Sequence, residues 1–254
     1  MPYKARIIAI ALMDLAVLCL LSRTPATANF DLYPLPPPER YGNILINRTS
    51  VKNGVKPATF SHWLHRRRHT CRVCHSELEF TMRVNTTEIT ERGNRSGRFC
   101  GAGGCHDGKA AFGHDKPHCD KCHNGDIGYG AEKFAELSGY PGTLFGNRIN
   151  WVGALESAMI VPRTFLKNRS EDIPFDKKLV LEAEWNFVPP AIFPHKSHTA
   201  WLDCNSCHPD LFNIKKKGTR DFSMRNILNG EFCGVCHLNV AFPVHDCQRC
   251  HPKM

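Results

Sequence analysis

The chain has 254 residues, of which 42% are hydrophobic and 22% are charged. This composition supports a folded protein and excludes collagen-like, low-complexity and fully disordered chains. The formal net charge of +9 raises nucleic acid or an anionic membrane as partners, and 13 cysteines are many for a soluble protein of this length.

The first 28 residues have the layout of a secretory signal peptide. Lys4 and Arg6 form a basic start, residues 7–21 are predominantly apolar, and residues 26–28 offer a small-x-small cleavage site before Asn29. An uncleaved membrane anchor is the alternative, but about 15 apolar residues fall short of the roughly 20 that span a bilayer. We therefore expect an exported protein of the periplasm or the cell surface, whose mature chain begins at Asn29.

Cysteine and histidine form a repeated motif in the mature chain. Cys19 leaves with the signal peptide, and the remaining twelve cysteines form six pairs that are each followed directly by histidine. Five pairs have the spacing Cys-x-x-Cys-His, and they are Cys71/Cys74/His75, Cys119/Cys122/His123, Cys204/Cys207/His208, Cys233/Cys236/His237 and Cys247/Cys250/His251. The sixth, Cys100/Cys105/His106, has four residues between its cysteines, and its glycine-rich loop is flexible enough to close the same ring.

Cys-x-x-Cys-His is the attachment signature of a c-type haem. Two thioether bonds fix one edge of the porphyrin, and the next residue reaches the iron as its proximal ligand. Structural zinc and disulfides also use paired cysteines, but neither explains a histidine after every pair, and a thioredoxin-like motif would occur once. The sequence therefore predicts six covalently attached haem c groups, with the proximal ligands His75, His106, His123, His208, His237 and His251.

The three-haem unit occurs twice. A shift of 133 residues lays residues 60–100 on residues 193–233 without a gap and aligns their first haem motifs. The predicted organisation is a signal peptide (1–28), a Pro-rich N-terminal extension (29–59), a first triheme module (60–125), a linker with a short helix (126–192) and a second triheme module (193–254).

A Phe-x-His-x-x-His segment precedes the first cysteine of each module. It supplies His62 and His65 in the first copy and His195 and His198 in the second. A lone histidine is more often a surface or core residue than a ligand, but two at matching places in both copies, beside haem motifs, favour ligation. We therefore expect these four residues to be distal ligands.

The first copy contains the segments FSHWLH, CRVCH, FCGAGGCH and CDKCH, and the second copy contains their counterparts FPHKSH, CNSCH, FCGVCH and CQRCH. Both sets resemble the triheme modules of cytochrome c7, within the cytochrome c3 class. The resemblance implies a chain that is mostly coil with short α-helices and little β structure, with haems forming the core. It also implies that His62 and His195 ligate the haem of the first motif, that His65 and His198 ligate that of the second, and that the chain transfers electrons outside the cytoplasm.

The distal ligand of the third haem stays open in both modules. The resemblance implies a ligand between the first and second motifs, where neither copy has histidine. Related modules have methionine there; Met224 fits this pattern, whereas its counterpart in the first copy is Glu91. His245 is the alternative in the second copy, and His114 or His118 supplies the ligand in the first. We favour His114 and leave both Met224 and His245 open.

The segments between the motifs predict less. A proline run favours an extended chain over residues 29–59, and the basic runs 66–68 and 215–217 are typical of solvated surface or of a docking patch for acidic partners. In the linker, Asn150 can cap a helix that Pro162 stops. The apolar face of this helix would consist of Trp151, Leu155 and Met159.

The predicted function is electron transfer by hopping along closely spaced haems, with redox proteins as donors and acceptors. The alternative is a subunit of an extracellular filament or an outer-membrane conduit, which implies a homo-oligomer or a membrane-bound cytochrome complex. A multihaem reductase is less favoured, because the other histidines are numerous enough to fill every distal position. Nucleic acid is not expected as a partner, because haem propionates would offset the positive charge.

Overall fold

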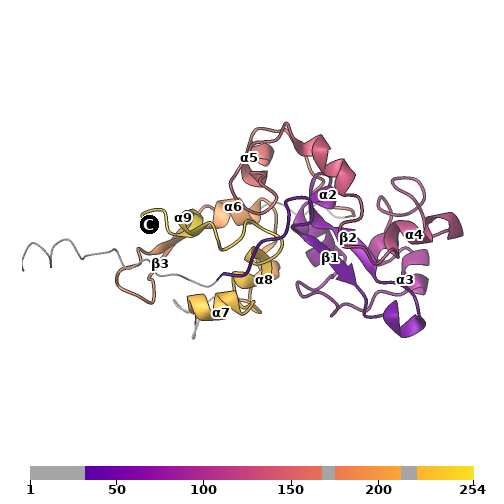
Figure 1. Ribbon diagram of the computed structural model, residues 1–254, viewed down its shortest axis with the longest axis horizontal. Helices are drawn as coiled ribbons and strands as arrows, with labels where there is room; N and C mark the ends of the chain where they lie inside the picture. The colour runs from indigo at the N-terminus through magenta and orange to yellow at the C-terminus, as the bar shows by residue number, and fades with distance from the viewer. Residues whose placement is uncertain (1–31, 168–174, 213–221) are drawn as a thin grey trace, which may run out of the picture. The chain divides into compact units, whose positions relative to one another are not determined.

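The computed structural model describes residues 32–167, 175–212 and 222–254 (Figure 1). The predicted signal peptide and the basic run 215–217 lie outside these residues. The described chain is mostly loops, with short helices and two two-stranded sheets, as predicted. No helix in this part of the chain is both long and apolar enough to cross a membrane.

The first module begins with an antiparallel hairpin of β1 (Asn43–Ile46) and β2 (Ala58–Ser61). The sequence predicted an extended chain here, but its prolines precede β1, and the Asn-Ile-Leu-Ile strand is free to pair. β2 runs directly into the helix that begins at His62. The helices are η1 (Val51–Asn53), α2 (His62–Arg66), η2 (Val73–Glu77), α3 (Glu91–Arg95), η3 (Phe99–Gly101), η4 (Lys116–His118) and α4 (Cys119–Cys122).

The second module repeats this order. A hairpin of β3 (Lys178–Leu181) and β4 (Ala191–Pro194) again leads directly into a helix that carries a histidine pair (Figure 1). The helices are α6 (His195–Thr199), η6 (Cys204–Ser206), α7 (Met224–Leu228), α8 (Gly234–His237) and α9 (Cys247–Cys250).

The two copies agree in unusual backbone detail at the second haem motif. Phe99 and Phe232, which precede the first cysteine, have φ values of 48° and 50°, a region that bulky residues rarely adopt. Gly101 and Gly234, which follow that cysteine, lie so close to the preceding helix that an added Cβ would be 1.9 Å from a backbone carbonyl oxygen. The repeat in the sequence is therefore a repeat in the structure.

The linker contains η5 (Ala131–Leu137) and α5 (Trp151–Glu156). Asn150 caps α5 as predicted, because its side chain accepts a hydrogen bond from the backbone N–H of Gly153 at 3.1 Å. The helix ends at Glu156, well before Pro162. Met159 therefore falls outside the predicted apolar face and is 46% exposed.

The principal apolar cluster joins the linker to both modules. Trp63 of α2 is 1% exposed, and Trp201, which follows α6, is 8% exposed. The linker supplies the remaining buried side chains of the cluster, which are Leu137, Ile149, Trp151, Ala154 and Ile160. The linker is thus a structural core element rather than a simple spacer.

Candidate functional site

The twelve cysteines of the described residues form no disulfides with one another, and all except Cys119 and Cys204 are at least partly buried. Burial raises the pKa of several of these thiols, and it does so to about 12 for Cys74, Cys100 and Cys236. Thiols in such apolar surroundings are poor nucleophiles and poor metal ligands. The same surroundings suit the edge of a porphyrin.

All six histidines of the haem motifs are held in one orientation. The Nδ1 atom of each lies 2.6–3.1 Å from a backbone carbonyl oxygen. A carbonyl can only accept a hydrogen bond, so Nδ1 carries the proton and Nε2 keeps its lone pair for a metal. The pairs are His75 with Phe80, His106 with Phe112, His123 with Lys56, His208 with Phe212, His237 with Phe242 and His251 with Pro189.

The hairpin of each module takes part in this orientation. His123 bonds to the carbonyl of Lys56, in the loop between β1 and β2. His251 bonds in the same way to Pro189, which is the counterpart of Lys56 in the loop between β3 and β4. The hairpin is therefore part of the module, a role that no motif in the sequence indicates.

The Phe-x-His-x-x-His histidines are oriented in the same manner. Nδ1 of His62 lies 2.7 Å from the carbonyl oxygen of Gly42, and Nδ1 of His195 lies 2.7 Å from that of Lys177. Nδ1 of His65 and of His198 bonds to a carbonyl four residues earlier, at 2.8 and 2.9 Å. Burial lowers the pKa of His62 to about 3, which keeps this imidazole neutral, the form that binds metals.

The structure brings proximal and expected distal histidines together. The ring centroids of His65 and His106 are 6.1 Å apart, and those of His198 and His237 are also 6.1 Å apart. Two metal–nitrogen bonds of about 2 Å and two ring radii of about 1 Å give roughly 6 Å for imidazoles that share one metal ion. The residues therefore fit an iron held between each pair.

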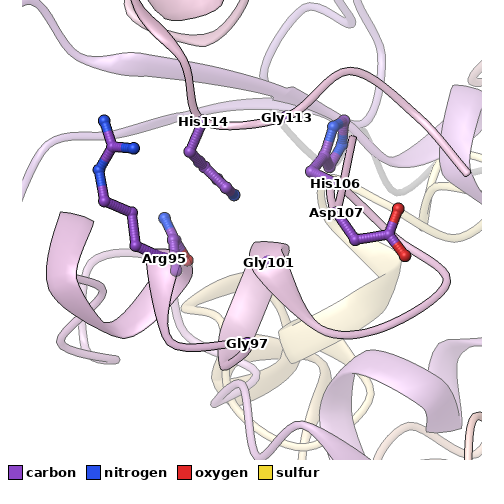
Figure 2. Close-up of a pocket in the computed structure, with 8 residues that line it drawn as sticks. Arg95, Gly97, Gly101, His106, Asp107, Gly113 and His114 are labelled. Carbon is purple, nitrogen blue, oxygen red and sulfur yellow. The ribbon is translucent and has the colours of Figure 1, made fainter. Parts of the chain in front are cut away.

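His114 lies beside the second motif of the first module. Its ring centroid is 6.5 Å from that of His106, and its Nε2 is buried with no hydrogen-bond partner among the described residues. Figure 2 shows its side chain beside Arg95, in a pocket of about 300 Å³. The other residues that line this pocket are Asn94, Gly97, Gly101, His106, Asp107 and Gly113.

The other candidate ligands of the third haems occupy distinct places. His118 bonds through Nδ1 to the carboxylate of Asp115 at 2.8 Å, which also orients a histidine for ligation. Met224 is the first residue of α7, and Glu91 is the first residue of α3, so the two are structural counterparts, as the sequence alignment predicted. His245 precedes α9 by two residues.

Sequence reasoning missed the role of Asp107 in the long motif. Its carboxylate accepts hydrogen bonds from the backbone N–H groups of Gly104, Lys109 and Ala110 at 2.8–2.9 Å, and these bonds lower its pKa to about 2. An aspartate followed by glycine is typical of such turns, so the signal was present. The turn fixes the end of the loop that contains Cys105.

The sequence profile described as "Cytochrome c7 and related cytochrome c" matches residues 58–124 and 191–252. The chain belongs to the cytochrome c7 family. The two matched segments coincide with the two copies of the repeat, and each contains three haem motifs and one histidine pair. The protein is thus a multihaem electron-transfer cytochrome with covalently bound haem c.

Solved multihaem structures also match this cytochrome, whereas no curated protein does. The C-terminal hexaheme fragment of GSU1996 is 26% identical, with 86% of this chain and 99% of that chain covered and a TM-score of 0.28. The dodecaheme cytochrome c GSU1996 is 23% identical, with 84% of this chain and 75% of that chain covered and a TM-score of 0.28. Its N-terminal hexaheme fragment is 23% identical, with 84% and 99% covered and a TM-score of 0.27.

In this cytochrome c the chain supplies two kinds of atom to haem c. The cysteine sulfurs of the motifs would attach haem c covalently, and the Nε2 atoms of the histidines would bind its iron. Bound haem c provides an iron that accepts and releases one electron. The Nδ1 hydrogen bonds orient the ligands, and burial keeps water away from them.

Proposed function

We propose that the protein is an exported hexahaem cytochrome that carries electrons between redox proteins along six closely spaced haems. The observation that carries this proposal is the common orientation of the six motif histidines, each with Nδ1 on a backbone carbonyl. An unused Cys-x-x-Cys-His segment has no need of such a contact. That it recurs at every motif supports six haems rather than five.

The long motif, Cys100/Cys105/His106, departs from the usual spacing, so haem attachment at this motif requires support of its own. His106 bonds to the carbonyl of Phe112 at 3.1 Å, and its counterpart His237 bonds to that of Phe242 at 2.8 Å. Each histidine also faces a distal candidate at the same distance. The two additional residues between Cys100 and Cys105 therefore leave the ligand geometry of the motif unchanged.

Consecutive motifs in the first module lie close together. Burial is the main cause of the raised pKa of Cys74, and the nearby thiol of Cys100 raises it further. In the same way, burial raises the pKa of Cys100, and the nearby thiol of Cys122 raises it further. The first, second and third motifs are therefore successive neighbours, which supports short steps between the haems they hold.

The second module shows a similar arrangement and connects to the first. Burial raises the pKa of Cys236, and the thiols of Cys71 and Cys207 raise it further. Burial also raises the pKa of Cys233, and the thiol of Cys250 raises it further. The path thus continues from the first motif of the first module into the second module, with the third motifs at its two ends.

We assign the distal ligands of these end haems to His114 and Met224. Burial is the main cause of the lowered pKa of His114, and the charge of His106 lowers it further. Asn94 and Arg95 of α3 line the same pocket as His114, so its ring lies near this helix. Met224 begins α7, the counterpart of α3. His114 therefore lies beside α3 and Met224 lies in its counterpart α7, which favours Met224 over His245.

The methionine assignment has a direct optical test. A thioether ligand gives oxidised haem a charge-transfer band in the near infrared, and we expect this band in the wild-type protein. Met224→His should remove it and lower one reduction potential, because methionine ligation raises the potential. Met159→Ala, at an exposed methionine, is the control and should keep the band. A band that survives Met224→His would contradict the assignment.

The predicted signal peptide supports export, and soluble or membrane-bound cytochromes are the expected class of donor and acceptor. Cell fractionation with N-terminal sequencing tests the location. We expect a periplasmic or cell-surface protein that begins at Asn29. A haem-free protein that retains Met1 in the cytoplasm would contradict this part of the proposal.

Low-temperature electron paramagnetic resonance with a redox titration tests the function. An electron carrier with both axial positions filled at every iron should give only low-spin ferric signals and six one-electron steps. A reductase would show a high-spin centre that changes when its substrate is added. Such a centre in the wild-type protein would overturn the assignment as a carrier.

A further inference from the structure

The loops that close the two hairpins are counterparts of each other. β2 contacts α4 and β4 contacts α9, so each hairpin packs against the helix of its third haem motif. The first loop (residues 47–57) bonds to His123, and the second loop (residues 182–190) bonds to His251. Each loop therefore lies beside the third motif of its own module.

The first loop is basic. Its charged residues are Arg48, Lys52 and Lys56. Nη2 of Arg48 lies 3.9 Å from a carboxylate oxygen of Glu88, whereas neither lysine pairs with a carboxylate among the residues that the structure describes. Both lysines are exposed, and Val51 and Val55 are 57% and 43% exposed. The loop thus presents two apolar side chains beside two uncompensated positive charges.

The second loop is acidic and aromatic. Its charged residues are Glu182 and Glu184, which are exposed, and no ion pair in the described part of the chain involves either of them. Trp185 and Phe187 are 37% and 72% exposed, and their rings lie nearly parallel with centroids 6.0 Å apart. The backbone N–H of Val188 donates to the carbonyl of Trp185 at 2.9 Å, so both rings belong to one tight turn.

The acidic character of the second hairpin is confined to its loop. The basic residue Lys178 pairs with Pro194 at the open end of the hairpin, whereas the loop begins after the pair of Leu181 and Ala191. A strand rises about 3.3 Å per residue, so about 10 Å of strand separates this cation from the loop. Salt screens charges across such a distance, because the Debye length is about 10 Å at about 0.1 M.

The basic run 66–68 is a poorer partner for an acidic surface than the first loop. Arg66 is partly buried, and its Nη2 donates to the carbonyl oxygen of Val240 at 3.2 Å. Arg67 donates to the carboxylate of Glu136 at 2.8 Å, which compensates its charge. The prediction of a solvated basic run is therefore wrong for Arg66.

The two loops are complementary in charge, and each carries two exposed apolar side chains. Opposite charges favour contact between a first loop and a second loop, whereas contact between like loops brings charges of one sign together. We propose that copies of this chain associate head to tail, with the second loop of one copy on the first loop of the next. Contact between unlike surfaces leaves one loop open at each end, so further copies can add.

The contact is small and therefore weak. Each loop has about ten residues, whereas a stable interface uses about 20–30 residues on each side. Because each loop bonds to a third-motif histidine, the contact places the third haem motifs of successive copies next to each other. Its use for electron transfer between copies rests on the proposed function, but the association itself does not.

Sedimentation velocity of the wild-type holoprotein at increasing concentration tests the association. The Debye length is about 30 Å at about 0.01 M salt and about 3 Å at about 1 M. We expect concentration-dependent association at low salt that weakens as salt is added. A protein that remains monomeric up to about 1 mM at low salt would overturn the inference.

Charge reversal identifies the two surfaces. Lys52→Glu and Glu184→Lys each place like charges in the contact, and each should lower the association constant about two- to tenfold. The double variant Lys52→Glu/Glu184→Lys restores opposite charges and should recover association, as should an equimolar mixture of the two single variants. Recovery shows that the single variants are folded. Failure of both the double variant and the mixture to recover association would overturn the pairing of these loops.

The apolar side chains have a matched control. Phe187→Ser should weaken association, whereas Val161→Ser, at a side chain that is 83% exposed and outside both loops, should leave it unchanged. Weakening by Phe187→Ser without any effect of Lys52→Glu would indicate a symmetric contact between two second loops and would overturn the head-to-tail arrangement. The haem content is measured separately, so a protein without haem would contradict the proposed function and leave this contact standing.

Discussion

The imidazole rings of His65 and His106 have their centroids 6.1 Å apart and their planes tilted by 52°, although the first haem motif lies between them in the sequence. Phe60 stacks on the ring of His65 at 4.3 Å and fixes its plane. In the second module Phe193 stacks on His198 at the same distance. Both modules therefore prepare the second haem site with the same three side chains.

Removing His65 should open that site. In His65→Ala the iron held by His106 loses its distal ligand, and one low-spin signal in the electron paramagnetic resonance spectrum of the oxidised protein should become high-spin. His69→Ala is the control, because His69 lies in the same segment and is only partly buried. An unchanged spectrum for His65→Ala, or a high-spin signal in His69→Ala, would refute the assignment.

Close packing at the second motif makes Gly234 intolerant of a side chain. A Cβ at this position would be 1.9 Å from the backbone oxygen of Ile227, so α7 and α8 would have to separate. We expect Gly234→Ala to lower the free energy of unfolding by about 1–3 kcal/mol. Denaturant unfolding of the holoprotein, followed by circular dichroism, measures this change.

Gly103 provides the matched control, because it lies within the other second motif and a Cβ there meets nothing within 4 Å. Gly103→Ala should change the free energy of unfolding by less than about 1 kcal/mol. Equal losses of unfolding free energy in Gly234→Ala and Gly103→Ala would show that the close contact between Gly234 and α7 does not exclude a side chain.

The first motifs of the two modules contact each other through an ion pair. Arg72 and Asp203 have side chains that are 12% and 29% exposed, and the backbone N–H of Arg72 also donates to the carbonyl of Trp201 at 3.0 Å. A double-mutant cycle of Arg72→Gln and Asp203→Asn should give a coupling free energy of about 1–3 kcal/mol in denaturant unfolding.

The pair of Arg95 and Glu91 on α3 is the comparison, since its side chains are 52% and 76% exposed. Its coupling free energy should be about 0.3–0.5 kcal/mol, because solvent screens exposed pairs. A coupling at Arg72 and Asp203 as small as this would mean that the ion pair does not stabilise the contact between the motifs.

Trp63 should be the most costly residue of the apolar cluster to truncate. It is 1% exposed, and its indole N–H donates to the carbonyl of Glu39 at 3.0 Å. Trp63→Ala should destabilise the holoprotein by about 3–5 kcal/mol in denaturant unfolding. Trp185→Ala, at a tryptophan that is 37% exposed, should cost much less. Similar losses of stability in the two variants would contradict a central role for Trp63 in the core.

The haem motifs and the repeat could be predicted because thioether attachment fixes local spacing. The Asn150 cap could also be predicted, because a helix cap depends on residues that are close together in the sequence. The contact between each hairpin and the third haem motif of its module could not be predicted. Lys56 and Pro189 make this contact through backbone carbonyls that lie far from the motif histidines in the sequence. Side-chain identity carries no signal for such contacts.

Arg66 shows a second limit of the sequence. It stands in a run of three arginines that is typical of solvated surface, and only Arg68 of the run is exposed. The difference arises from Trp151 and Trp201, which reach Arg66 from the linker and from the other module. Similarly, Met159 continues the spacing of the apolar face but follows the end of α5, and its side chain is exposed.

The mass of the intact exported protein tests the central claim most directly. The account predicts a mass that exceeds that of the mature polypeptide by six haem groups, and a loss of one haem when Cys100 and Cys105 are both replaced by serine. A wild-type mass that fits five haems or fewer would contradict the hexahaem cytochrome.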